Sequence, residues 1–324
     1  MSLKTPLAIA AVAAVAVTPA LAQECDWTPE RAVTYIVPWG AGGGTDANSR
    51  MLASMLEARF GVPFNVVNRT GGNGVTGHSA IATAEPDGYT VGAVTVEINT
   101  MHHVGLTDLT RNDVTPIALV DIVPSSVLVK TDSEFESLDQ LLEHAKANPG
   151  SLTASGTSQG GIWHLALAGM LNAEGIEPDA IRWIPSQGAA PAMQELMAGG
   201  VDVATPALSE GKALIEQGEL KALAYMHTDR MEALPDVPTT AELLDSGWTL
   251  AAFITISGPD GLPDEIRCAY EEAVLEIVDT QEWADFKASR GADVVKMGSE
   301  ELTAYMAESD EALGATIEAI GLKQ

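Results

Sequence analysis

Strand-like and helix-like segments alternate along most of this 324-residue sequence. The first strand-like run, Val33–Val37, is followed by an amphipathic segment at residues 46–60, and similar pairs recur to about residue 225. This alternation predicts an α/β fold with a mainly parallel sheet and covering helices. The length predicts two domains or lobes. No stretch resembles a flexible linker, so we expect the chain to cross between the lobes more than once through strand-like hinges.

The sequence PWGAGGGTDANS at residues 38–49 follows the first strand directly. It does not fit the phosphate motifs: Asp46 stands where a P-loop has lysine, and Gly40-x-Gly42-x-x-Thr45 lacks the last glycine of the dinucleotide fingerprint. The segment still has the pattern of a strand, a glycine turn and the start of a helix, and Thr45 or Asp46 could cap that helix. Unpaired N–H groups and the positive end of the helix dipole bind anions without a basic side chain. A tight turn without a ligand is the alternative, but it needs fewer glycines.

Two further glycine motifs allow more than one interpretation. Residues 72–77 (GNGVTG), taken by themselves, match the dinucleotide fingerprint. They do not follow the first strand of their unit, however, so a second glycine turn beside the first is the plainer interpretation. Residues 156–160 (GTSQG) match the nucleophile turn of serine hydrolases, with Ser158 as nucleophile. Only His164 and His227 follow it as triad partners. The other interpretation is an anion-binding helix start that faces the opening turn across a cleft.

The N-terminus has the pattern of a secretory signal, with Lys4, an apolar run and a small-residue end. We expect cleavage after Ala22 and a soluble periplasmic protein. The alternative is a membrane anchor, for which the run is short and rich in alanine. The formal net charge of −28 repels nucleic acid and anionic lipid. A bound anion must therefore be held by local dipoles.

The cysteines and histidines lead to two separate expectations. Cys25 and Cys268 form an even pair in an oxidising compartment, which predicts a disulfide, with two free thiols as the alternative. His102 and His103 are adjacent, so on a strand or helix their side chains would point apart. We therefore predict no metal site, and nothing in the sequence calls for a cofactor.

An ordered set of motifs resembles the periplasmic receptors of tripartite tricarboxylate transporters, the Bug family. These motifs are VPWGAGGGTD at 37–46, VNRTGGNG at 67–74, PDGYT at 86–90, NPG at 148–150, SGT at 155–157 with HLA at 164–166, GGVD at 199–202 and LPDVPT at 234–239. The resemblance implies a type II periplasmic-binding-protein fold, in which two α/β lobes joined by two hinge crossings close on a ligand like a Venus flytrap. On this basis we expect lobe 1 at residues 23–121 and 255–324, and lobe 2 at residues 122–254.

The resemblance also implies a function. Receptors of this family are not enzymes; they bind a small organic carboxylate and deliver it to membrane permease subunits, and we expect this one to be a monomer. The family holds its ligand largely through backbone amides and bridging waters, without an obligatory arginine. Residues 185–188 (PSQG) depart from the Tyr-Lys-Gly that is common in the family, which removes a cation near the cleft.

The resemblance maps ligand contacts onto both halves of the chain. The predicted ligand-binding residues are Trp39, Ala41, Gly42, Gly43, Thr45, Asp46, Thr95, Ser155, Gly156, Thr157, His164, Gln187, Gly188, Ala189 and Asp202. The ligand class stays open between a di- or tricarboxylate, an aromatic acid and an acidic amino acid. Two alternative functions also remain: a secreted serine hydrolase that uses Ser158, and a sensory subunit that signals to a membrane kinase.

Overall fold

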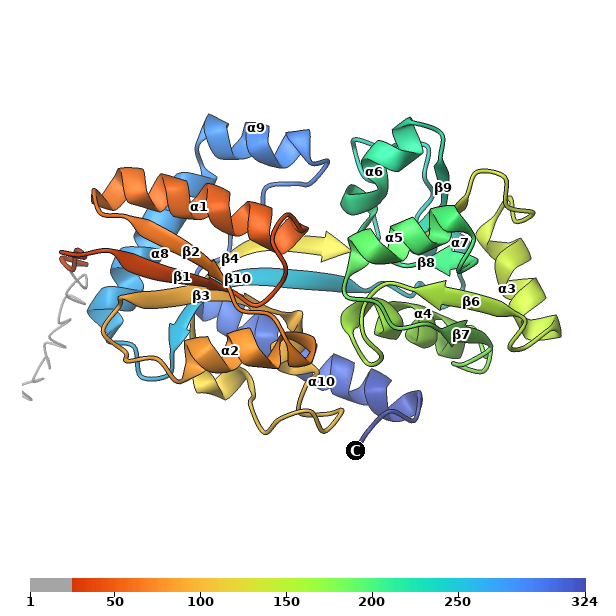
Figure 1. Cartoon of the computed structure of the whole chain (residues 1–324), viewed down its shortest axis with the longest axis horizontal. Helices are drawn as coiled ribbons and strands as arrows, with labels where there is room; N and C mark the ends of the chain where they lie inside the picture. Colours follow the sequence, from red (N-terminus) through yellow and green to blue (C-terminus); the bar gives the residue numbers. More distant parts are fainter. Residues whose placement is uncertain (1–24) are drawn as a thin grey trace, which may run out of the picture.

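The computed structural model describes residues 25–324 and contains two five-stranded sheets (Figure 1). The first sheet has the strand order β2-β1-β3-β10-β4, and the second has the order β7-β6-β8-β5-β9. The strands of the first sheet are β1 (Val33–Val37), β2 (Phe64–Asn68), β3 (Thr90–Thr95), β4 (Val114–Pro124) and β10 (Ala251–Pro259). Those of the second are β5 (Ser126–Lys130), β6 (Leu152–Ser155), β7 (Ile181–Trp183), β8 (Val203–Ala204) and β9 (Leu220–Tyr225).

Helices cover both sheets. In the first lobe these are α1 (Gly44–Phe60), α2 (Val75–Ala82), α8 (Asp264–Val278), α9 (Gln281–Ser289) and α10 (Ser299–Ala319), with the 3-10 turns η1 (Gly72–Gly74), η2 (Val96–Asn99) and η3 (Arg111–Asp113). In the second they are α3 (Leu138–Ala147), α4 (Ile162–Ala173), α5 (Ala189–Ala198), α6 (Leu208–Glu216) and α7 (Thr240–Leu243). Within residues 25–324, no helix combines the length and apolarity needed to cross a bilayer.

The core of the first lobe lies on both faces of its sheet because successive strand residues point to opposite sides. Tyr35 on β1 packs with Leu52 of α1 and Tyr270 of α8 on one face. Its neighbour Ile36 packs with Ile81 of α2 on the other face. Strands buried on both faces are nearly continuously apolar, as the sequence of β1 is apart from Thr34.

Both sheets are mixed, which corrects the expectation of a mainly parallel sheet. β1 pairs in parallel with β2 and β3, and β6 pairs in parallel with β7 and β8. However, β10 is antiparallel to β3 and β4, and β5 is antiparallel to β8 and β9. The reason is the path of the chain: β10 returns to the first sheet from the second lobe and therefore runs against its neighbours.

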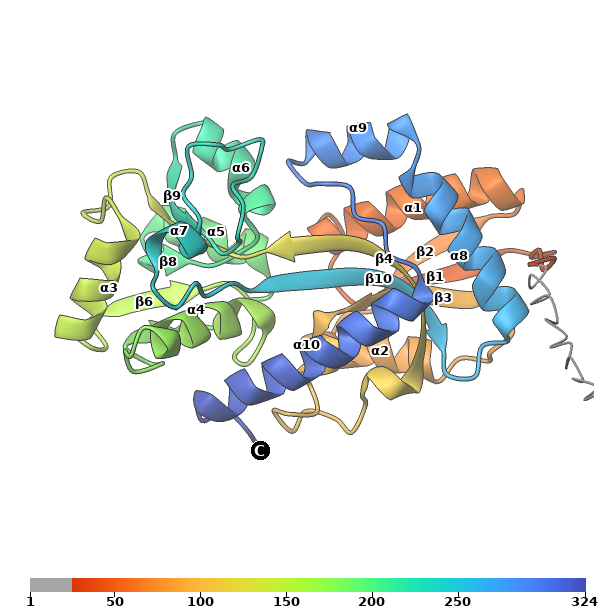
Figure 2. The ribbon, with the colours of Figure 1, turned by 180° about the vertical axis from the view of Figure 1, so that it is seen from behind.

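Two long strands connect the lobes. In both views β4 and β10 lie side by side between the lobes, with β4 running toward the second lobe and β10 running back toward the first (Figures 1 and 2). β4 ends at Pro124, and the chain enters the second sheet as β5 at Ser126. Asp121 and Ile254, where the expected lobe limits fall, are partners in the β4–β10 ladder. The limits themselves stay a prediction.

Helix α10 lies across both lobes on one side of these strands (Figure 2). It packs against β4 in the first lobe and against α4 in the second. Gly169 on α4 makes room chiefly for the ring of Trp248, which a Cβ there would approach to 2.4 Å, and such a Cβ would also lie 3.2 Å from Cγ2 of Thr316 on α10. α10 therefore contacts both lobes beside the connecting strands β4 and β10.

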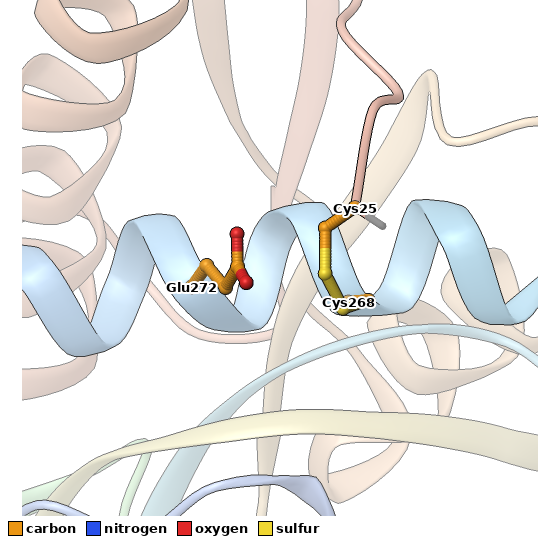
Figure 3. Close-up of side chains that lie close together, drawn as sticks. All are labelled: Cys25, Cys268 and Glu272. Atoms are coloured by element: carbon orange, nitrogen blue, oxygen red, sulfur yellow. A yellow bond between two sulfur atoms is a disulfide. The ribbon is translucent and has the colours of Figure 1, made fainter. Parts of the chain in front are cut away.

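A disulfide joins Cys25 to Cys268 on α8 (Figure 3). The ring of Trp27, two residues further on, lies 5.3 Å from that of Tyr270 and 6.0 Å from that of Tyr89, measured between centroids. The start of the described chain is thus held against the first lobe. The expected signal peptide and its cleavage after Ala22 lie outside the described residues.

Candidate ligand-binding site

A cavity of about 310 Å³ lies between the two lobes. The first lobe contributes the turn after β1, the side chain of Thr95 and parts of β4 and β10, and the second lobe contributes Thr157 and the starts of α4, α5 and α6. Arg290, at the end of α9, completes the wall. This volume is at the lower end of the range for small-molecule pockets, so the cavity suits a small ligand.

Four helices begin at the wall of this cavity, and none has a side-chain cap. The N-cap residues of α1, α4, α5 and α6 are Gly43, Gly161, Gly188 and Ala207, which have no side-chain oxygen to accept a bond from the first N–H groups. Of the helices that begin elsewhere, α3, α7 and α9 have a Ser or Thr hydroxyl as their cap, whereas α2, α8 and α10 have no side-chain cap. The positive ends of four helix dipoles therefore meet at one cavity, which favours an anion.

Asp46 shapes the turn after β1 instead of lining the cavity. Its carboxylate accepts bonds from the Gly42 N–H at 2.9 Å, from Asn68 Nδ2 at 2.8 Å and from Arg50 Nε at 2.9 Å. Burial raises the pKa of Asp46, but these hydrogen bonds outweigh it and hold the pKa below the usual value. The carboxylate thus folds the turn back on itself, with Gly42 at φ 85°. The N–H groups of Gly43 and Thr45 donate to no acceptor within residues 25–324.

A hydrogen-bonded chain positions Trp39 at the cavity. Its Nε1 donates to Thr95 Oγ1 at 3.1 Å, and that hydroxyl donates to Glu97 Oε2 at 2.6 Å. The Thr95 N–H donates to His78 Nε2 at 3.0 Å, so His78 carries its proton on Nδ1, which donates to the Gly74 carbonyl at 2.8 Å. Burial lowers the pKa of His78 to about 4, which keeps the ring neutral.

The second glycine stretch packs beneath the first turn. A Cβ at Gly77 would lie 2.4 Å from Cα of Pro38, and one at Gly74 would lie 3.3 Å from the ring of Trp39. Gly74 also has φ 92°, a conformation that side chains disfavour. These contacts account for the glycines by close packing, as the interpretation of a second turn requires, and no dinucleotide is needed to explain them.

In the SGT motif of the second lobe, Ser155 and Gly156 serve the packing of the lobe and Thr157 lines the cavity. The Ser155 hydroxyl donates to the Ile184 carbonyl at 2.7 Å, away from the cavity. A Cβ at Gly156 would lie 2.7 Å from Cβ of Trp163 and 2.9 Å from the ring of Trp183, so this glycine permits close packing. Thr157 lines the cavity, and its buried Oγ1 has no partner within residues 25–324. Of the three, Thr157 is the residue that lines the cavity.

His164 and Asp202 act within the second lobe. His164 Nδ1 accepts from the Gly160 N–H at 3.0 Å, its ring lies 4.9 Å from that of Trp183, and burial lowers its pKa to about 4. The Asp202 carboxylate accepts from the Thr153 N–H at 2.8 Å and from its hydroxyl at 2.9 Å. Both side chains fix loops that follow β6 and α5.

The structure brings some of the predicted ligand residues together and leaves others outside. Those that line the cavity are Trp39, Ala41, Gly43, Thr45, Thr95, Thr157, Gln187, Gly188 and Ala189. Those outside its wall are Gly42, Asp46, Ser155, Gly156, His164 and Asp202. The outer group holds the turns in place and so acts on the cavity indirectly.

Three charged residues at the cavity have no sequence motif. Arg290 is half-buried, and its guanidinium has no hydrogen bond or ion pair within the described chain. The Glu210 carboxylate faces the Gly44 N–H across the cleft, and burial raises its pKa to about 7. Asp121 differs from these two, because Lys287 pairs with it at 2.5 Å and Asn48 donates to it at 3.0 Å. Arg290 is therefore the cation available to a ligand.

Two α/β lobes, two connecting strands and an interlobe cavity define the class of the protein: a solute-binding protein of the periplasmic type. Residues 49–322 match the family described as "Tripartite tricarboxylate transporter family receptor", and the chain belongs to this family. Its members are solute-binding receptors and not enzymes, which leaves no role for Ser158 as a nucleophile.

Three relatives illustrate the match. BugT of Bordetella pertussis is 28% identical over 304 residues, which cover 92% of each chain. The crystal structure of a TctC solute-binding protein from Polaromonas is 29% identical, with a TM-score of 0.72 over 90% of this chain and 99% of that one. Rpa4515 of R. palustris, solved with adipate, is 26% identical, with a TM-score of 0.82 over 91% and 99% of the two chains.

Proposed function

We propose that this protein is an extracytoplasmic receptor that binds a small organic carboxylate between its lobes and delivers it to a tripartite tricarboxylate-type permease. The observation that carries this proposal is the convergence of four uncapped helix starts on one cavity. The relative solved with adipate supports the ligand class. Export with cleavage after Ala22, a monomeric state and the lobe limits at residues 121/122 and 254/255 belong to the same proposal.

One carboxylate of the ligand would bind at the helix starts. The Gly43 and Thr45 N–H groups of α1 and the Ala189 and Ala190 N–H groups of α5 are donors without partners within residues 25–324. The Thr157 hydroxyl adds a side-chain donor. A hydrogen bond to a charged group contributes about 1.5–3 kcal/mol, so several of these donors suffice in a chain whose net charge is −28.

A second carboxylate would bind at Arg290. The guanidinium lies in the cavity wall without a hydrogen bond or ion pair in the described chain, and its planar fork suits a carboxylate. A dicarboxylate matches both the helix starts and Arg290, whereas a monocarboxylate leaves Arg290 unpaired. We therefore propose that the receptor prefers dicarboxylates.

A thermal-shift screen of carboxylates on the mature protein tests this function. A ligand at a hundred times its dissociation constant stabilises the folded state by about 2.7 kcal/mol. The matched probes are adipate, hexanoate and adipamide, which share a six-carbon chain and carry two, one and no carboxylates. Stabilisation by carboxylates and not by the diamide is the expected result. Equal stabilisation by adipamide, or none by any carboxylate, would contradict the proposal.

Delivery requires a second experiment, because a sensory receptor can share the fold. Crosslinking of the ligand-loaded protein in cells that carry the permease should recover a permease subunit. Recovery of a membrane kinase ectodomain, and of no permease, would instead assign the receptor to signalling.

A further inference from the structure

His102 and His103 converge on one carboxylate at the edge of the first lobe. They lie in the turn after η2, and Asp310 lies on α10. His102 Nε2 is 3.2 Å and His103 Nε2 is 3.0 Å from the same Oδ1 of Asp310. Adjacent side chains would point apart on a strand or helix, but these residues lie in a turn, which brings the two rings to 4.0 Å between centroids.

The spacing of these donor atoms fits a metal ion. A tetrahedral zinc site, with ligand bonds of about 2.0–2.1 Å, separates neighbouring donor atoms by about 3.3 Å. The two nitrogen–oxygen distances are close to this value, and the three donor atoms all lie within 4.8 Å of one another. The side chains are 20–22% exposed, so an ion can reach them from solvent. Small shifts would let an ion replace the contacts to Oδ1.

The surroundings hold the ligands in place. The other carboxylate oxygen of Asp310 lies 3.5 Å from Arg111 Nε, which leaves Oδ1 for the ion. Gly314, one turn along α10, makes room for the histidine: a Cβ there would lie 2.6 Å from Cε1 of His103. The ring of His103 is therefore confined between the turn and the helix.

We propose that His102, His103 and Asp310 bind a divalent transition-metal ion such as Zn²⁺. Two imidazoles and one carboxylate suit zinc and its neighbours, not Ca²⁺ or Mg²⁺, which prefer oxygen ligands. Both cysteines of the chain are joined in the disulfide, so no thiolate competes. The ion would tie the turn after η2 to α10, the helix that contacts both lobes (Figure 2). None of the three ligands lines the interlobe cavity.

Calorimetric titration of Zn²⁺ into mature, tag-free, chelator-stripped protein tests the site, and the absorption bands of added Co²⁺ report its ligands. We expect one ion per chain and a loss of affinity of at least about tenfold in Asp310→Asn and in His103→Gln. The matched control is His144→Gln, which removes a half-buried histidine on α3 that is not one of the three proposed ligands and should bind as the unmodified protein does.

Two results would overturn the proposal: affinity unchanged in both variants, or a loss in His144→Gln as large as theirs. Should Asp310→Asn fail to fold, His102→Gln serves in its place, because it keeps the contacts of Asp310 with His103 and Arg111. Carboxylate binding is measured on the same samples. Since the metal site and the interlobe cavity share no residue, each proposal can fail without the other.

Discussion

Replacing Arg290 with glutamine should weaken the binding of a dicarboxylate and leave a monocarboxylate of equal length almost unaffected. The guanidinium lies in the cavity wall over the ring of Phe286 and has no hydrogen bond or ion pair in the described chain, so it can pair with a second carboxylate. Glutamine keeps much of the side-chain volume and one donor group but removes the charge. The change therefore tests the charge and not the shape of the cavity.

The expected magnitude follows from the surroundings of Arg290. A charge-assisted hydrogen bond contributes about 1.5–3 kcal/mol. Arg290 is half-buried, so solvent screens its charge. Its charge also interacts with Glu210 and Asp121: it lowers the pKa of each, although burial raises both pKa values by more. The lower limit of about 1.5 kcal/mol therefore applies, which is about a tenfold rise in the dissociation constant.

The assay is isothermal titration calorimetry with adipate and hexanoate on both proteins. Adipate should lose about tenfold in affinity in Arg290→Gln, and hexanoate should change by less than about twofold. Arg69→Gln is the control, because Arg69 is exposed and does not line the cavity. An equal loss for both ligands, or no loss for adipate, would refute the assignment of Arg290 to a second carboxylate.

Three further predictions concern other parts of the molecule. Burial raises the pKa of Glu210 to about 7, so this group is neutral below that pH and repels an anion above it. Carboxylate affinity should therefore fall as the pH rises through about 7, and calorimetry of Glu210→Gln should show no such fall. The double change Cys25→Ser and Cys268→Ser should lower the free energy of unfolding by about 2–4 kcal/mol in denaturant titrations and leave ligand affinity intact. Gly156→Ala should lower the melting temperature, because its Cβ would lie 2.7 Å from Trp163; an unchanged melting temperature would show that the backbone yields there.

Much of the fold could be predicted because its elements have local signals. β1 has the bounds that the sequence indicates, and α1 begins at Gly44, two residues before the expected Asp46. β10 gives a weaker signal, because it alternates polar and apolar residues only over residues 254–257, and its Thr255 and Ser257 are buried as fully as the apolar residues beside them. Its direction depends on pairing with β3 and β4, which are distant in sequence. The mixed character of the sheets could not be predicted for this reason.

The residues of the candidate site also fall into those that the sequence could predict and those that it could not. The turn with Trp39 and Gly43 could be predicted because a strand, clustered glycines and a helix start are contiguous. Arg290 and Glu210 could not, because each comes from a separate segment and reaches the cavity only through the packing of α9 and α6. Motif residues such as Asp202 indicate the family, yet their side chains hold loops together. A family motif thus marks both the residues at the cavity and those that support them.

The central claim is that backbone N–H groups at the helix starts hold the ligand, and Gly43→Val tests it most directly. Gly43 has φ −76° and ψ 175°, which valine adopts readily, and a Cβ there would meet only the Gly40 carbonyl, at 3.7 Å. The variant should therefore fold with an unchanged melting temperature while its side chain blocks the N–H groups of α1. Calorimetry with the tightest carboxylate from the screen should show binding lost in Gly43→Val and retained in Arg69→Gln. Binding that survives Gly43→Val with unchanged affinity would contradict the account.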